Sequence, residues 1–226
     1  MADFTLRPSK APNLLVAPVV YDQRYVDQLT NALRLYFNQV DNVTGTVLGN
    51  DGGKYIQNPH IAASDTTTQY ADGDNDPTIV KWNTLDSGTG FTLNPSYTAT
   101  CLESGVFKID YSLQFANTAN SPEDVIVWLK VNGVDVPRSA SKITMTTRKS
   151  AMVPSYLLMY STVTFEVQTG DEIGLWWATD KAYNPVGPVD GVYMEYEPAQ
   201  TSPYPHPSIP SAIGAITFVS RLPTTA

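Results

Sequence analysis

The segment GVFKIDYSLQFA, residues 105–116, alternates apolar and polar side chains and decides the fold class of this 226-residue chain. A period of two residues is typical of a β-strand with one face buried and one face in water. The segment therefore predicts a half-buried strand. Its apolar face holds Phe107, Ile109, Tyr111, Leu113 and Phe115.

The same period continues further along the chain. DVIVWLKV (124–131) is followed by Asn132-Gly133, a pair favoured in hairpin turns because both turn positions need positive φ. YSTVTFEVQTGDEIGLWW (160–177) predicts a second hairpin that turns at residues 169–171. Further strands are expected at 78–84, 91–101, 155–160, 191–196 and 214–221. Short strands at this spacing indicate a mainly β, antiparallel sandwich over residues 43–226.

Two proline-rich segments are expected to lie outside the central strands, because proline lacks the backbone N–H that a sheet needs. Residues 1–20 hold three prolines and predict an extended attachment arm. Residues 196–214 hold five prolines and predict a segment that runs extended across a surface. A closing strand at 214–222 follows.

Residues 21–42 predict the one helix, with Asp22 as its N-cap. Apolar residues recur every three or four positions and define one stripe. Asp41, Asn42 and Gly45 are expected to end the helix, while Leu35 and Phe37 lie off the stripe. The stripe, a candidate trimerisation or docking surface, consists of Tyr21, Tyr25, Leu29, Leu33, Tyr36 and Val40.

Charge and composition exclude several kinds of partner. The net charge is −8 and no basic run exceeds Arg148-Lys149, which argues against nucleic acid and against an anionic membrane surface. No window is apolar enough for membrane insertion, and no signal peptide is evident. The single cysteine, Cys101, is expected to be a buried, unreactive side chain.

No catalytic residue is expected, because no nucleophile, phosphate-loop or metal-ligand motif is present. Asp72, Asp74 and Asp76 in ADGDNDPT resemble the start of a calcium loop, but the later glycine and glutamate are missing. We expect a solvated acidic turn and no cofactor, with a structural Ca²⁺ as the alternative. Trp128 and Trp176 are expected to point outward as surface anchors, either at a subunit interface or as a platform for sugars.

The succession FTLNPSYTATCLESGVFKIDYSLQFA, VIVWLKVNGVDV and STVTFEVQTGDEIGLWW resembles the jelly roll shared by the globular head of complement and tumour necrosis factor. The resemblance covers roughly residues 55–182, and the Gly170-Asp171 hairpin is its most specific part. It implies a jelly-roll sandwich and a homotrimer. Animal members follow a collagen stalk or a membrane anchor, and this chain departs from them there.

The helix segment and the ending PSIPSAIGAITFVSRL resemble small structural proteins of tailed phages, especially phages of marine bacteria. This resemblance implies a virion component that binds capsid or tail proteins through its arm and helix. The helix would either pack against the helices of the other two subunits on the three-fold axis or pack on its own sheet. The resemblance leaves open whether the protein sits on the head or on the tail of the virion. The alternatives are a tail-fibre adhesin for host surface glycan and a glycan depolymerase.

Overall fold

The computed structural model describes residues 12–14, 16, 18–48, 58–151, 153–187 and 189–222. The chain divides into two compact units, Met1–Gln57 and Asn58–Ala226. The first unit contains the helix α1 (Gln23–Leu48) and the second contains the strands. The sandwich unit thus begins at Asn58, where position 43 was expected. Residues 1–11, 15 and 17 of the expected arm lie outside the described residues.

The helix α1 is longer than the sequence predicted. Asp22 is its N-cap, as expected, because its Oδ1 accepts a hydrogen bond of 2.9 Å from the Arg24 N–H. The expected end at Asn42 is wrong, since α1 continues through Gly45 to Leu48. One glycine in a helix interior costs only about 1 kcal/mol relative to alanine, which is too little to stop a helix.

Within its described residues, the second unit has strands as its only regular secondary structure. Their bounds are β1 (His60–Asp65), β2 (Gln69–Tyr70), β3 (Thr78–Ile79), β4 (Thr84–Thr89), β5 (Phe91–Leu93), β6 (Ala99–Cys101), β7 (Gly105–Asn117), β8 (Glu123–Val131), β9 (Val134–Asp135), β10 (Ser141–Met145), β11 (Ser155–Val167), β12 (Glu172–Thr179), β13 (Val192–Met194) and β14 (Ala212–Ser220).

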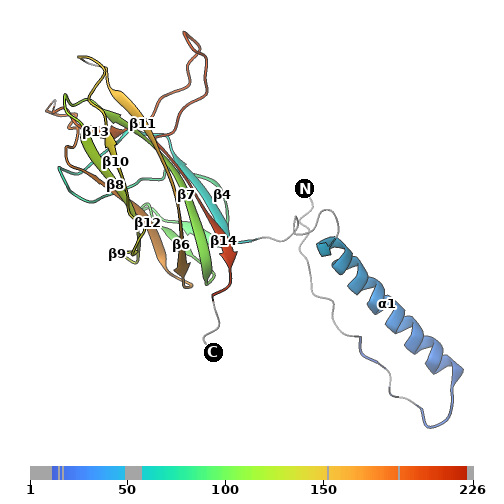
Figure 1. The fold of residues 1–226 in the computed structure, drawn as a ribbon. Helices are drawn as coiled ribbons and strands as arrows, with labels where there is room; N and C mark the ends of the chain where they lie inside the picture. Colours follow the sequence, from blue (N-terminus) through green and yellow to red (C-terminus); the bar gives the residue numbers. More distant parts are fainter. Residues whose placement is uncertain are drawn as a thin grey trace. The chain divides into compact units, whose positions relative to one another are not determined.

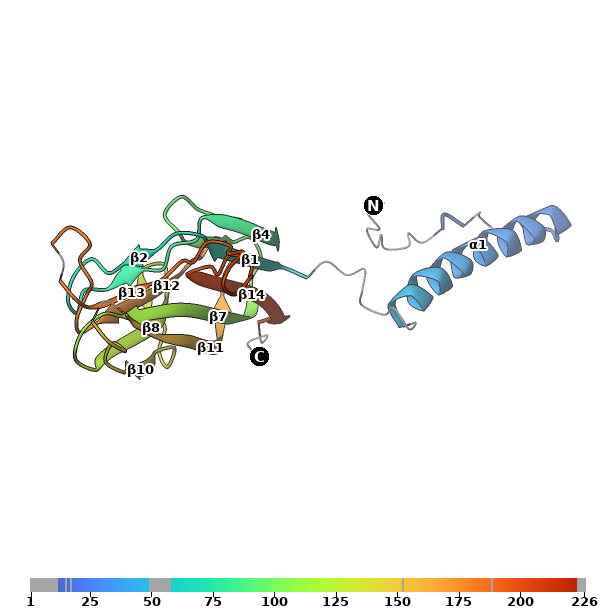
Figure 2. The ribbon, with the colours of Figure 1, turned by 90° about the horizontal axis from the view of Figure 1, so that it is seen from above.

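In the described residues the strands form two seven-stranded sheets, the layers of a sandwich, and eight of the strands make the frame that can be followed in Figure 1 and from above in Figure 2. One layer has the order β1-β14-β7-β11 and the other has the order β6-β12-β8-β10, with all pairs antiparallel. Counted along the chain, these are strands 1-8-3-6 and 2-7-4-5, the order of a jelly roll. The predicted fold class is confirmed.

The core lies between the two layers and follows the alternation of the sequence. Every apolar residue of the predicted β7 face is at most 4% exposed, while Lys108, Asp110 and Ser112 on the other face are half-buried. The facing layer contributes Val127, Leu129 and Trp177, all fully buried. The turn after β8 is also confirmed, with φ of 51° at Asn132 and 76° at Gly133.

The proline-rich segment does not run extended across a surface. It folds back on itself, because Glu197 and Ile209 exchange both backbone hydrogen bonds, as do Gln200 and His206. The returning chain then enters β14, which begins at Ala212 and lies between β1 and β7. The last strand is therefore a central strand of its sheet.

Candidate functional site

The predicted helix stripe becomes a regular seam along α1. Tyr25, Leu29, Leu33, Tyr36 and Val40 are half-buried, whereas Tyr21 precedes the helix and is 80% exposed. The additional turn of helix adds Val43 to the series. Val26, Leu29, Leu33, Tyr36, Val40 and Val43, hereafter the helix seam, are spaced alternately by three and four residues. This spacing is that of the contact positions in a coiled coil.

A second apolar surface lies on the outward face of β11. Tyr156, Leu158 and Tyr160 occupy successive outward positions and are 52%, 54% and 65% exposed. We call these three residues the β11 strip. Ile213 of β14 continues the surface across Ser112 of β7, to which both Tyr160 and Ile213 are paired. An outward face of this composition is suited to contact with another protein.

Trp128 and Trp176 point outward, as predicted, and the structure brings them together as cross-strand partners on β8 and β12. Lys130 lies over both rings, with its Nζ 4.6 Å from the Trp176 centroid and 5.9 Å from the Trp128 centroid. The Trp128 Nε1 donates a 2.8 Å hydrogen bond to Asp135. The lysine thus already uses the rings, which makes this pair a poorer platform for sugars than the sequence suggested.

The acidic turn at Asp72, Asp74 and Asp76 has a structural role. The Ala182 N–H donates a 2.8 Å hydrogen bond to Asp74 Oδ1, and the Asn75 N–H donates one of 2.7 Å to the Thr179 carbonyl. The turn is thereby held against the chain that follows β12. Nowhere among the described residues do three His, Cys, Asp or Glu side chains gather to hold a metal ion. The geometry gives the calcium alternative no support.

A hollow of about 290 Å³ opens between this turn and the loop after β12. We call it the loop hollow. Tyr70 and Tyr183 form its aromatic wall and stack with their ring centroids 5.7 Å apart. Burial raises the pKa of Tyr70, and the neighbouring Tyr183 and Glu195 raise it further. Sequence reasoning did not bring these residues together, because Tyr70 and Tyr183 are far apart along the chain.

A larger hollow of about 530 Å³ lies on the outward face of the β7 layer and includes Gln114, Tyr156 and Glu195. The Glu195 carboxylate is half-buried and accepts a 3.2 Å hydrogen bond from the Tyr193 hydroxyl. Burial raises the pKa of Glu195, although hydrogen bonds from Tyr193 and Tyr156 oppose the change. No sequence motif predicted that the Glu195 carboxyl group would be half-buried.

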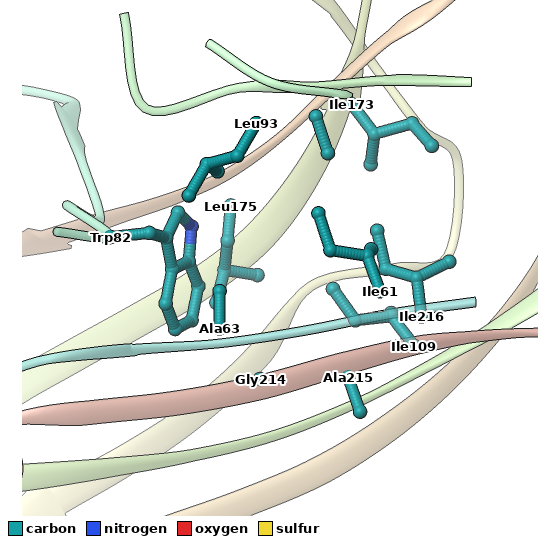
Figure 3. Close-up of a pocket in the computed structure, with 11 residues that line it drawn as sticks. Ile61, Ala63, Trp82, Leu93, Ile109, Ile173, Leu175, Gly214, Ala215 and Ile216 are labelled. Atoms are coloured by element: carbon teal, nitrogen blue, oxygen red, sulfur yellow. The ribbon is translucent and has the colours of Figure 1, made fainter. Parts of the chain in front are cut away.

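The apolar cavity between the layers, shown in Figure 3, is not a binding site. Its volume is about 30 Å³, and apart from the aromatic ring of Trp82 its labelled side chains are aliphatic. An apolar space of this size stays dry and excludes ligands. Trp82 covers one side of it by lying against Gly214, where a Cβ atom would be 2.8 Å from the Trp82 Cη2.

Cys101 is fully buried, as expected, and burial raises the pKa of its thiol. The thiol donates a hydrogen bond to the Glu103 carbonyl at 2.9 Å.

In the described part of the chain, no helix has both the length and the apolar character for a membrane span.

The second unit belongs, by its own strand order, to the jelly-roll class of antiparallel sandwiches. Among solved structures, Eiger TNF from S. frugiperda is similar, with a TM-score of 0.44 and 12% sequence identity over 74% of this chain and 98% of that chain. No protein-family model matches the sequence. No curated protein matches it either.

Proposed function

We propose that this protein is a non-enzymatic structural component of a tailed-phage virion, a trimeric head fibre, knob or tail-associated protein attached through its N-terminal arm and helix. The observation that carries the proposal is the helix seam, which lies on a unit separate from the jelly roll. A helix of 26 residues is about 39 Å long and presents a seam that parallel helices can share. The sequence resemblance to phage structural proteins supports the assignment to a particle.

The β11 strip supports self-association of the jelly-roll units. Three successive exposed apolar side chains on one strand are better covered by another subunit than left in water. We expect light scattering on the purified chain to give a mass near three times 24.7 kDa. A monomer at micromolar concentration would contradict the trimer.

The attachment role is tested by deleting residues 1–57. The remaining unit, Asn58–Ala226, has its own core and is expected to fold as a knob. Particles assembled with this truncated chain should lack the knob, while the full chain should be incorporated. Incorporation of the truncated chain at the level of the full chain would refute attachment through the arm and helix.

Adhesion to host surface glycan is the second candidate function, and the loop hollow favours it. Aromatic rings beside carboxylate and amide groups suit polyhydroxylated ligands. The test is retention of the purified protein on host polysaccharide, together with the change in host range when residues 180–190 are exchanged. Protein that is not retained, with a host range that does not change, would argue against adhesion.

A further inference from the structure

The aromatic wall of the loop hollow is rigidly built. Tyr70 belongs to β2, Tyr193 to β13 and Tyr183 to the loop after β12. The Tyr183 and Tyr193 ring centroids are 5.0 Å apart, and those of Tyr70 and Tyr193 are 6.0 Å apart. Three rings from three segments hold one another in place, so Tyr70, which is 36% exposed, and the half-buried Tyr183 present a fixed apolar surface to water.

The polar groups of the hollow supply both acceptors and donors. The Asp72 carboxylate is exposed and has no hydrogen bond or ion pair to any residue of the described ranges. Asp74 uses Oδ1 to hold Ala182 and keeps its second oxygen available. Asn184 accepts a 2.9 Å hydrogen bond from the Val186 N–H through Oδ1, which leaves its amide NH₂ free to donate.

The hydrogen bond from the Ala182 N–H to Asp74 Oδ1 joins the two sides of the hollow, and further contacts fix the loop side before any ligand binds. Gly191 permits the close approach of the chain, because a Cβ atom there would lie 2.4 Å from the Ala182 carbonyl carbon. The Tyr183 N–H also donates to the Val192 carbonyl at 3.1 Å. A hollow whose walls are joined in this way is preformed, as small-ligand sites usually are.

The charge of the lining selects the class of ligand. No lysine, arginine or histidine is among the described residues that line the hollow, and Asp72 and Asp74 would repel an anion. A cation would use the carboxylates and, through cation–π attraction, the ring faces, but it would leave the amide donor without a partner. A sugar ring uses all three, because its hydroxyls donate and accept and its C–H face packs on an aromatic ring.

We propose that the loop hollow binds one ring of a neutral saccharide, held against Tyr183 and Tyr70 with hydroxyls donating to Asp72. The inference deepens the second candidate function, adhesion to glycan, and is independent of the virion role. Asp72 accepts hydroxyl hydrogen bonds in this arrangement, and the Asn184 amide donates one.

Saturation-transfer NMR on the full chain tests the proposal with the methyl glycosides of glucose, galactose, mannose and N-acetylglucosamine. At least one should receive transfer at its ring protons. Asp72→Asn and Tyr183→Ala should each weaken its binding roughly tenfold, through loss of a charged acceptor and of the ring surface. Tyr183→Phe keeps the ring and should retain binding, as should Tyr204→Ala, a tyrosine 80% exposed outside the hollow.

The Asp72→Asn variant keeps the test decisive if Tyr183→Ala disturbs the loop, because the Asp72 side chain supports no other group. Absence of transfer to all four glycosides would overturn the proposal, as would binding that neither Asp72→Asn nor Tyr183→Ala weakens. Binding of ethylammonium or Ca²⁺ without any glycoside would overturn it too. Retention on host polysaccharide that survives both substitutions would refute this site and leave adhesion standing.

Discussion

Gly214 shows at the scale of one residue how the sandwich depends on a missing side chain. The Gly214→Ala substitution places a Cβ atom against the Trp82 ring, which must then move away from the cavity that it covers. We expect a loss of about 1–3 kcal/mol in the free energy of unfolding, measured by urea denaturation, as is usual for overpacking.

The matched control is Gly45→Ala in α1, where no atom lies within 4 Å of the new Cβ position. Alanine should there stabilise the helix by about 1 kcal/mol, seen as higher helicity by circular dichroism. A Gly214→Ala protein as stable as the unsubstituted protein would mean that Trp82 does not pack as described.

Glu195 makes a prediction about pH. Burial raises the pKa of Glu195, so the folded chain holds this proton more tightly than the unfolded chain, in which the pKa is 4.5. The stability that this group contributes is therefore fully present below about pH 4.5 and is lost as the pH rises through the folded pKa. Glu195→Gln should make the fall in urea midpoint above this pH shallower.

In the Glu195→Gln protein, Glu123 should still cause part of the fall in urea midpoint with pH, because burial raises the pKa of Glu123 as well. Substitution of an exposed glutamate on β11, Glu166→Gln, removes one carboxylate elsewhere in the same unit and serves as the control for the change in net charge. An identical pH dependence in Glu195→Gln and the unsubstituted protein would show that the Glu195 carboxylate is better solvated than its half-buried position indicates.

At the scale of the element, α1 offers a matched pair of substitutions two residues apart. Leu33 belongs to the helix seam, whereas Leu35 lies off it and is 56% exposed. Leu33→Asp should break self-association by placing a charge in the seam, lowering the mass in light scattering toward that of one chain. Leu35→Asp should leave the mass unchanged, and equal effects of the two would exclude the seam as the contact surface.

The elements differ in how far the sequence determined them. The alternation in β7 predicted its buried face residue by residue, because a shift of one residue would turn every apolar side chain of that face away from the core. The end of α1 could not be predicted, because Asp41, Asn42 and Gly45 are signals that a continuing apolar seam overrides. The fold-back of residues 196–209 was also missed, since proline content excludes a central strand without saying where the chain goes.

At the scale of the whole molecule, the two units should unfold separately. Every buried side chain of the main core comes from residues beyond Asn58. We expect the isolated unit, Asn58–Ala226, to keep the urea midpoint that tryptophan fluorescence reports in the full chain, because all four tryptophans lie in this unit. A midpoint lowered by removal of residues 1–57 would mean that the first unit stabilises the jelly roll.

The loop hollow is assembled from segments that are distant in the sequence, and it was therefore the feature least predictable from the sequence. Tyr70, Asp72 and Tyr183 meet only because β13 pairs with both β2 and β7 and brings distant segments to one end of the sheet. The outward direction of Trp176 was predictable from one strand, but its pairing with Trp128 needed the β8–β12 register. Local sequence patterns thus predict which face of a strand is buried, whereas the strand pairing decides which distant residues meet in a site.

The pairing of β1 with β14 places both chain ends of the jelly roll at the same end of the sandwich. The main chain enters at His60 and leaves near Ser220, at the same extremity, because His60 faces Thr217 across the ladder. Tyr70 and Tyr183 lie toward the opposite extremity, beyond Asp65 and Ala212. Under the N-terminal attachment that we propose, foreign peptides inserted between residues 184 and 187 should consequently be displayed away from the attached end of the jelly roll, whereas a peptide inserted after residue 222 would lie close to that end.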